Sequence, residues 1–156
     1  LQANATLNLD PIGFRGARLD VEVIKRFMNV TDPFTGLERP FSYDQEGAFE
    51  IDFRHDVPGS AWAWGASLDH DDPAPYARRY EEGREWEGPV WGGLFIEHKD
   101  VFGLTVQARA SNLLGARNYF RRTVYDGERP DGDIRFEEYQ DRRIGPIFRL
   151  TVSGDF

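Results

Sequence analysis

Cysteine is absent from this chain of 156 residues, which excludes a disulfide framework and a thiolate metal site. No stretch approaches the roughly 18 uninterrupted apolar residues of a membrane-spanning helix, so a helical membrane protein is excluded as well. Positive charge is also scarce, because 19 Lys and Arg stand against 27 Asp and Glu for a net charge of -8. A nucleic-acid partner would need a basic surface, and we expect none.

Aromatic residues, in contrast, are abundant at 14% of the chain, with 4 Trp, 6 Tyr and 12 Phe. The mean hydropathy of -0.59 resembles that of a soluble protein, but the strands of a transmembrane barrel dilute apolar residues in the same way. The length suits one domain, which we assign to residues 1–156. The chain begins inside a strand pattern, from which we expect a fragment or a processed form.

Period-two alternation of apolar and polar residues is the strongest pattern in the chain. In the final segment Phe148, Leu150 and Val152 lie on one face, and the segment ends on Phe156. The same alternation marks residues 1–9, 17–27, 48–54, 61–69, 89–98 and 103–111, although the consecutive apolar residues Leu94 to Ile96 leave one register open. With no helical periodicity, the pattern predicts an all-β, antiparallel up-and-down meander of about seven strands.

Short turns and longer connections alternate along the chain. The turns at 10–16, 55–60 and 99–102 are short, whereas 29–40, 69–88 and the tip at 126–133 are longer. Outer-membrane barrels show this asymmetry. The last third predicts one long hairpin folded about its tip, with kinks near Leu114-Gly115 and Ile144-Gly145 and with Asn112 opposite Ile147.

The C-terminal residues carry a family resemblance. Asn112-Leu113-Leu114 ends a strand, Ala116-Arg117-Asn118-Tyr119 follows, and the chain closes with Ile147 to Phe156. This resembles the end of the TonB-dependent outer-membrane receptors, in which an Asn-Leu-aromatic/Leu motif closes the penultimate strand and Phe closes the last. Two upstream stretches fit receptor-barrel loops less diagnostically, namely Asp32-Pro33-Phe34-Thr35-Gly36 and Trp86-Glu87-Gly88-Pro89.

The resemblance implies the C-terminal segment of a transmembrane-type β-barrel of about 22 strands, located in the bacterial outer membrane. The intact receptor would take up a small ligand, such as a metal chelate or another nutrient, by energy-coupled transport. The implied partners are outer-membrane lipid, the barrel assembly machinery and the rest of the receptor with its plug domain, which this segment lacks. A TonB-type coupling protein would be contacted only through the missing N-terminal part.

About seven strands cut from a large barrel would have two open edges, whose backbone groups lipid cannot satisfy. We therefore expect the segment to reclose into a smaller barrel or to self-associate edge to edge. The alternative is a small soluble ligand-binding β-barrel or β-sandwich with no membrane role. A lipid-facing barrel would depend on detergent, whereas a sandwich would be soluble.

The candidate site residues fall in two groups. His70, Asp71 and Asp72 in the long connection 69–88 are candidates for an outer ligand contact, as are Arg142 and Arg143 on the wall of the last hairpin. The final strand resembles a signal for outer-membrane assembly, carried by Phe148, Leu150, Val152 and Phe156.

Carboxylates and arginines also alternate along several strands. Asp20, Glu22, Glu50 and Asp52, beside Arg18, Arg54 and Arg109, suggest either acid–base catalysis or a charge ladder that lines a wet lumen. The charges are spread over several strands rather than focused in one site, which favours the ladder. No catalytic triad, phosphate-binding loop or metal motif is present, so we expect neither an enzyme nor a cofactor.

Overall fold

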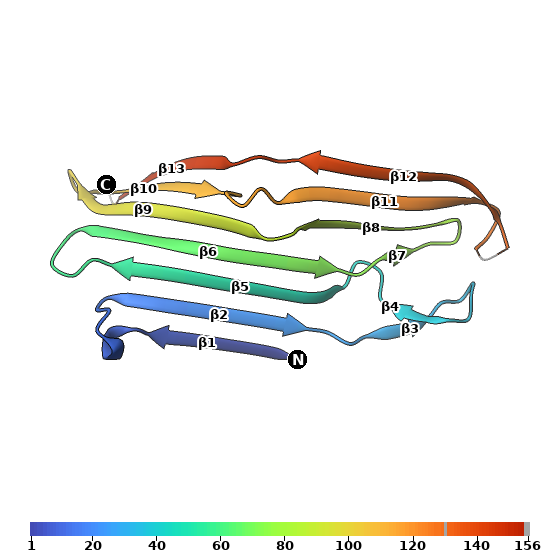
Figure 1. The fold of residues 1–156 in the computed structure, drawn as a ribbon, viewed down its shortest axis with the longest axis horizontal. Coiled ribbons are helices and arrows are strands. Elements are labelled where there is room, and N and C mark those ends of the chain that lie inside the picture. Colours follow the sequence, from blue (N-terminus) through green and yellow to red (C-terminus); the bar gives the residue numbers. More distant parts are fainter. Residues whose placement is uncertain (130, 155–156) are drawn as a thin grey trace.

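Strands make up most of the chain in the computed structural model, which describes residues 1–129 and 131–154 (Figure 1). All strand pairs are antiparallel, as the alternation predicts. In chain order the elements are β1 (Gln2–Asn8), the 3₁₀ turn η1 (Asp10–Ile12), β2 (Ala17–Lys25), β3 (Asn29–Thr31), β4 (Glu38–Pro40), β5 (Gln45–Asp56), β6 (Trp62–Pro73), β7 (Tyr76–Ala77), β8 (Glu81–Gly88), β9 (Trp91–Val101), β10 (Leu104–Ser111), β11 (Arg117–Asp126), β12 (Asp133–Arg143) and β13 (Ile147–Ser153).

Seven of the strands form one sheet in the order β1-β2-β5-β6-β9-β10-β13. The short turns β1–β2, β5–β6 and β9–β10 lie together at one end of this sheet (Figure 1, left). The longer connections all extend beyond its other end. The predicted meander and the predicted asymmetry of its connections are therefore confirmed.

The last four strands form the predicted long hairpin. Ser111 lies opposite Ile147 in β10–β13, and Arg117 lies opposite Arg143 in β11–β12. The register is one residue away from the predicted pairing of Asn112 with Ile147. Both arms of the hairpin lose strand structure between these two ladders, at residues 112–116 and 144–146. The kinks therefore lie where they were predicted.

Buried Asn112 holds that break together. Its φ of 54° is in the left-handed region, which Asn tolerates better than most residues. The side-chain amide donates to the carbonyl oxygens of Ala116, at 2.9 Å, and Gly145, at 3.0 Å, and its oxygen accepts from the Ala116 N–H at 2.6 Å. One side chain thus stabilises the interruption in both arms.

The longer connections are themselves built of strands, so their prediction as loops is wrong. β6 continues to Pro73, and β7 and β8 follow, where the sequence predicted one loop over 69–88. A four-stranded sheet β12-β11-β8-β7 and a two-stranded sheet β3-β4 lie at this end. β8, β11 and β12 carry charged residues on both faces, and the alternation that marks a half-buried strand is therefore missing.

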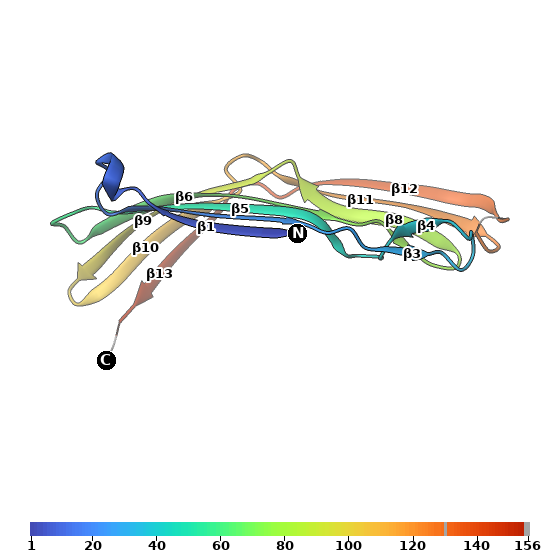
Figure 2. The same ribbon diagram turned by 90° about the horizontal axis from the view of Figure 1, so that it is seen from below.

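The described strands form a single curved layer (Figure 2). β1 and β13 are the ends of the seven-stranded sheet and do not pair with each other, so residues 1–129 and 131–154 neither reclose into a small barrel nor stack as a sandwich. The predicted reclosure is therefore wrong for the chain on its own, and the described residues do not form the alternative sandwich, whereas edge-to-edge self-association stays a prediction. It exposes 10436 Å², whereas a compact monomer of its mass would expose about 8,000 Å².

Helices add little to this architecture. In the described part of the chain, no helix has the length and apolar character needed to cross a membrane.

Candidate functional site: a two-faced sheet and an outer cleft

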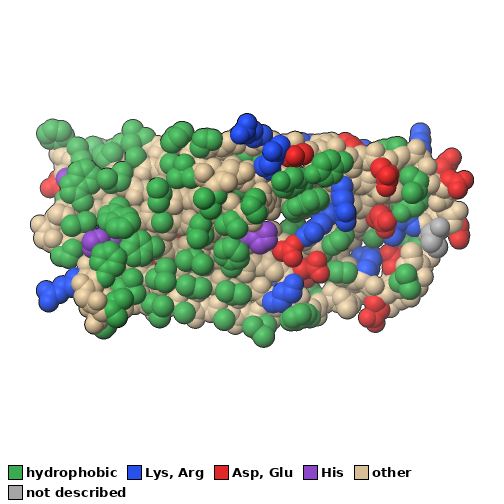
Figure 3. Space-filling model, in the orientation of Figure 1, with side chains coloured by type: hydrophobic (Ala, Val, Ile, Leu, Met, Phe, Trp, Pro, Cys, Tyr) green, Lys and Arg blue, Asp and Glu red, His purple; other side chains and the backbone are tan. Residues whose placement is uncertain are grey.

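One face of the seven-stranded sheet is apolar from edge to edge. Directly opposed residues of antiparallel strands share a face, so the pairing defines rows across the sheet. One row contains Leu7, Leu19, Phe53, Ala66, Leu94, Ala110 and Phe148. Figure 3 shows hydrophobic side chains over most of this face, and the exposed fractions of Leu94 and Phe148 are 53% and 75%. No second layer of the described chain covers them.

The apolar face is the convex one. Phe14 follows η1 and packs against Phe53 and His55, which lie on the apolar face. In Figure 2 the η1 turn stands above the sheet, whereas β9, β10 and β13 curve downward away from it. The sheet therefore bends so that its apolar side chains point outward.

Aromatic and histidine rings gather on this face near the short turns. The Trp64 ring contacts Phe53 and His55, and its Nε1 donates to His55 Nδ1 over 3.0 Å. Trp62 meets His98 edge to face, with 4.6 Å between the ring centroids. These rings form a band across the neighbouring strands β5, β6 and β9.

The opposite face is polar and carries the predicted charge ladder. Asp20 lies opposite Asp52, and Glu22 lies opposite Glu50. Arg54 donates to Glu97 at 2.6 Å, from two strands away. The pattern is a spread of neighbouring charges across several strands, and these carboxylates do not enclose one reaction centre.

The strand near Leu94 to Ile96 acquires a clear register. Leu94 and Ile96 lie opposite Ala110 and Ala108 and therefore belong to the apolar face. Phe95 lies on the polar face, where the guanidinium groups of Arg54 and Arg109 approach its ring to 5.5 and 5.6 Å from the centroid. The run of three apolar residues thus contributes to both faces.

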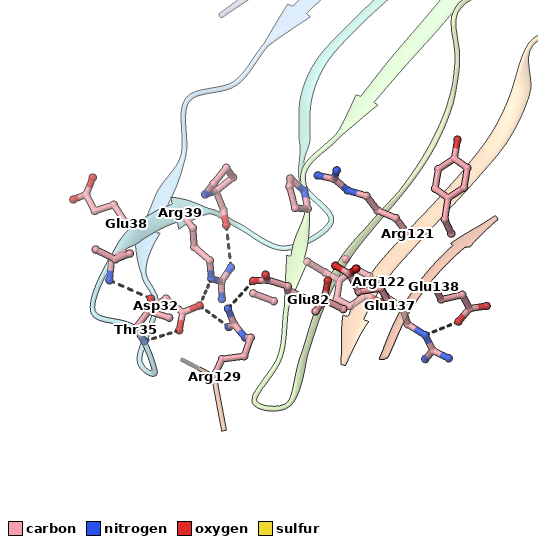
Figure 4. Close-up of a pocket in the computed structure, with 18 residues that line it drawn as sticks. Asp32, Thr35, Glu38, Arg39, Glu82, Arg121, Arg122, Arg129, Glu137 and Glu138 are labelled. Atoms are coloured by element: carbon pink, nitrogen blue, oxygen red, sulfur yellow. Dashed lines mark hydrogen bonds and ion pairs between the residues drawn. The ribbon is translucent and has the colours of Figure 1, made fainter. Parts of the chain in front are cut away.

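A cleft of about 610 Å³ lies between the outer hairpins (Figure 4). The β3–β4 hairpin forms one wall, and β8, β11 and β12 form the other. Tyr76 and Gly83 are buried between the walls, and the Gly83 position has no room for a side chain because the Tyr76 ring and a β11 carbonyl occupy it. The rest of the lining is mostly polar.

A buried ion pair closes one end of this cleft. Asp32, from the β3–β4 hairpin, is 1% exposed, and Arg129, from the tip of the last hairpin, is 6% exposed. Arg129 Nη2 donates to Asp32 at 2.8 Å, and its other nitrogens donate to Glu82 and to the Arg78 carbonyl. Three connections are thereby joined through one guanidinium, as the dashed lines of Figure 4 show in part.

Asp32 also organises its own turn. Its carboxylate accepts from the backbone N–H of Phe34, at 2.9 Å, and from Arg39 Nε, at 2.8 Å. Burial raises the pKa of Asp32, but the hydrogen bonds from Arg129, Phe34, Arg39 and Thr35 outweigh it, so the pKa lies well below its usual range. The carboxylate is therefore charged wherever the protein is folded at ordinary pH.

The structure separates the three residues predicted as an outer ligand contact. His70 to Asp72 belong to β6 rather than to a loop, so that prediction of their placement is wrong. His70 packs against the Phe49 ring in a tilted arrangement, Asp71 accepts from Gln45 at 2.7 Å, and Asp72 pairs with Arg84. Because neighbouring strand residues point to opposite faces, the three do not converge.

Arg142 and Arg143 are separated for the same reason. Both are exposed at the end of β12, far from the hairpin tip, and they point to opposite faces of the sheet. Arg142 donates to Gln140, whereas Arg143 lies opposite Arg117. They do form part of the hairpin wall, as predicted, but not one site.

The final strand presents Phe148, Leu150 and Val152 on the apolar face at an open edge. Their exposed fractions are 75%, 70% and 55%. Phe156 lies outside the described residues. The assembly role of these four residues stays a prediction.

Sequence reasoning missed Asp32, Arg39 and Arg129. Asp32 and Arg129 are 97 positions apart and sit in polar turns, where charges are usually solvated. The Asp-Pro-x-Thr-Gly turn was the only local signal for Asp32. The search of residues 1–129 and 131–154 found no group of three or more His, Cys, Asp or Glu side chains that could hold a metal ion.

Comparisons of the chain with models of protein families, with curated proteins and with solved structures gave no match.

Proposed function

We propose that this chain is a section of the wall of an outer-membrane β-barrel, with its apolar face against lipid and its charged face toward a wet lumen. The observation that carries the proposal is the apolar face, which is convex, continuous over seven strands and uncovered. Monomeric soluble proteins rarely expose such a large contiguous apolar patch. A barrel wall has this two-faced construction.

The dimensions of the apolar face support this reading. On β6 it extends from Trp62 to His70, nine residues of strand, which is the length of a tilted transmembrane β-strand. The ring band of Trp62, Trp64 and His98 would lie at one membrane interface. The outer hairpins, which carry charged residues on both faces, would stand in water beyond the other interface.

We further propose that the barrel is a TonB-dependent receptor, so that the chain contributes to the uptake of a small ligand. The support for this step is the resemblance around Asn112-Leu113-Leu114 and in the last strand. The open edges at β1 and β13 suit a section whose neighbours are further strands of the same barrel or of a second copy. The implied partners are those of a receptor: lipid, the assembly machinery, a plug and a coupling protein.

Single cysteines along β10 test the membrane proposal, since the chain has none of its own. The variants Val106→Cys, Gln107→Cys, Ala108→Cys and Arg109→Cys would each carry a nitroxide label in reconstituted vesicles. Collisions with oxygen, which partitions into lipid, should be frequent at 106 and 108, and collisions with a water-soluble nickel chelate should be frequent at 107 and 109. Equal access of the nickel chelate to all four positions would contradict a lipid-facing sheet.

The receptor proposal has a separate test. Reading the coding sequence upstream of Leu1 should reveal a plug domain. A barrel-forming sequence with no plug would favour another class of outer-membrane protein.

Deleting Phe156 tests the proposed assembly signal. We expect a lower yield of protein inserted in the outer membrane, because the last strand would lose its terminal aromatic contact with the assembly machinery. Insertion would be measured by membrane fractionation and heat-modifiable gel mobility. Replacing Phe156 with Tyr or Trp should restore the yield, and an unchanged yield on deletion would count against the signal.

A further inference from the structure

Where the apolar face ends, toward the outer hairpins, the same side of the molecule carries a group of cations. We call this group the cation belt; its members are Lys25, Arg84, Arg117, Arg121 and Arg143. Figure 3 shows blue side chains at the border where the green area gives way to charges. We propose that the cation belt binds the phosphate groups of anionic lipid headgroups, an inference that rests on the membrane proposal above.

The pairing of the strands places these cations on the outward side. Lys25 is the next residue after Val23 on the apolar face of β2, and it lies in one row with Gly47 and Asp72. Arg84 reaches Asp72 from β8 and shares a row with Arg121. The belt therefore continues from one sheet to the next at a single level.

Arg117 and Arg143 extend the belt along the last hairpin. They lie opposite each other on β11 and β12, on the same face as Arg84 and Arg121. This row is the first one beyond the break at Asn112, where the apolar strands β10 and β13 end. The cations thus begin within a few residues of the last lipid-facing side chains.

Three of the five cations are available to a ligand. Arg84 pairs with Asp72, and Arg117 pairs with Asp141. In contrast, the side chains of Lys25, Arg121 and Arg143 make no hydrogen bond or ion pair with the described residues. The belt therefore contains five cations and is neutralised by only the two carboxylates of Asp72 and Asp141. It carries net positive charge in a chain whose overall charge is -8.

Aromatic rings accompany the cations. Trp86 stacks on Tyr119 with 5.2 Å between centroids, and the Arg84 guanidinium lies 5.3 Å from the centre of the Trp86 ring. Trp and Tyr concentrate at membrane interfaces, where one part of the ring meets apolar chains and the other meets water. Guanidinium groups bind phosphate oxygens in bidentate fashion. Together they match the headgroup layer of a lipid leaflet.

The position of the belt favours a lipid over a soluble anion. The neighbouring apolar face would hold the acyl chains of the same molecule whose phosphate meets the belt. A soluble phosphate ligand would gain nothing from that continuity. Of the four arginines that line the outer cleft, Arg39, Arg122 and Arg129 are already paired with carboxylates, and the fourth, Arg121, belongs to the belt as well.

Spin-labelled lipids test the proposal in vesicles of neutral phosphatidylcholine containing the full chain. The fraction of motionally restricted label is measured once with spin-labelled phosphatidic acid and once with spin-labelled phosphatidylcholine. The ratio of the two association constants gives the preference for phosphatidic acid. A cation at a lipid surface is worth about fivefold in binding, so we expect a preference of at least about fivefold. The variant Lys25→Gln/Arg121→Gln/Arg143→Gln should reduce that preference to near one, without leaving a paired carboxylate alone.

The matched control removes three cations from the opposite face. The variant Arg109→Gln/Arg142→Gln/Arg149→Gln has the same change in net charge and should retain the preference. No preference in the unmodified chain, or an equal loss in both variants, would overturn the proposal. So would displacement of the labelled phosphatidic acid by inorganic phosphate at constant ionic strength, because the belt would then be a site for the free anion.

The same measurement separates the two proposals. Restricted phosphatidylcholine reports that the sheet contacts lipid at all. If no restricted lipid appears, the membrane proposal fails. If restricted lipid appears without selectivity, only the cation belt is refuted.

Discussion

In the seven-stranded sheet one face is apolar and the other is charged, whereas the outer strands β8, β11 and β12 carry charges on both faces. The strand pairing is antiparallel in both regions. Under the membrane proposal, the sheet meets lipid on one face and water on the other, whereas the hairpins meet water on both sides. One continuous set of hairpins would then pass from one solvent to another without changing its backbone structure.

The two regions also differ in what holds them together beyond the backbone ladders. The seven-stranded sheet has rows of side chains and ion pairs that are exposed or partly exposed, and such pairs contribute little in water. The outer region has the buried pair Asp32–Arg129 that joins three connections. Because its partners come from separate hairpins, the cleft depends on this pair more than the sheet depends on any one contact.

Breaking that pair should have the largest effect. Arg129→Met removes three hydrogen bonds and leaves the buried Asp32 carboxylate with Arg39 as its remaining guanidinium partner, and we expect a local destabilisation of about 3–5 kcal/mol. Amide hydrogen exchange should increase in the β3–β4 hairpin and at the tip of the last hairpin, but not in β5 or β6.

Two comparison variants sharpen this result. Asp32→Asn combined with Arg129→Met should be less harmful than Arg129→Met alone, because no charge remains buried. Arg79→Met removes an exposed ion pair with Glu128 and should leave exchange unchanged. Faster exchange throughout the molecule in Arg129→Met would show that the two regions are not independent.

A charge on the apolar face should have the next largest effect, confined to the sheet. Leu94→Arg should cost about 2–4 kcal/mol of stability in bilayers, because Leu94 lies opposite Ala66, midway between Trp62 and His70 on the apolar face. Gln107→Arg, on the polar face of the neighbouring strand, should cost far less because it faces water. Urea unfolding in vesicles measures both, and equal losses would contradict the two-faced reading.

The junction between the two regions gives a smaller effect. Asn112→Ala removes three hydrogen bonds at the break and places Ala at positive φ, for an expected loss of about 1–3 kcal/mol. Asn118→Ala, which loses one contact of 3.2 Å to Glu85, is the matched control. If the two variants unfold at the same urea concentration, Asn112 does not stabilise the junction.

The smallest expected effect is that of acid on the stability of the outer cleft. The pKa of Asp32 is lower in the folded state than its ordinary value near 3.9, so its contribution to stability is complete above about pH 5 and is lost as the pH falls through the folded value. Proteolysis of the outer hairpins should therefore be constant from about pH 5 to 8 and increase only in stronger acid. In Asp32→Asn this acid-dependent step should disappear.

Local pattern was enough to predict the strands of the sheet, their faces and the kinked hairpin. Val21, Ile51 and Val106 alternate with polar neighbours because one face of each strand is apolar, and such alternation is readable without knowing any partner. The extension of β6 through His70 to Pro73 and the strand β8 were not readable, since polar and charged residues on both faces remove the alternation.

The sequence by itself determined an antiparallel sheet with an apolar and a charged face, because side-chain period and backbone geometry are local properties. Only the tertiary structure decided that Arg129 meets Asp32, that His70 and Asp72 have separate partners, and that five cations share one level beside the apolar face. Those relations depend on the register between strands far apart in the chain. No local pattern of residues encodes that register by itself.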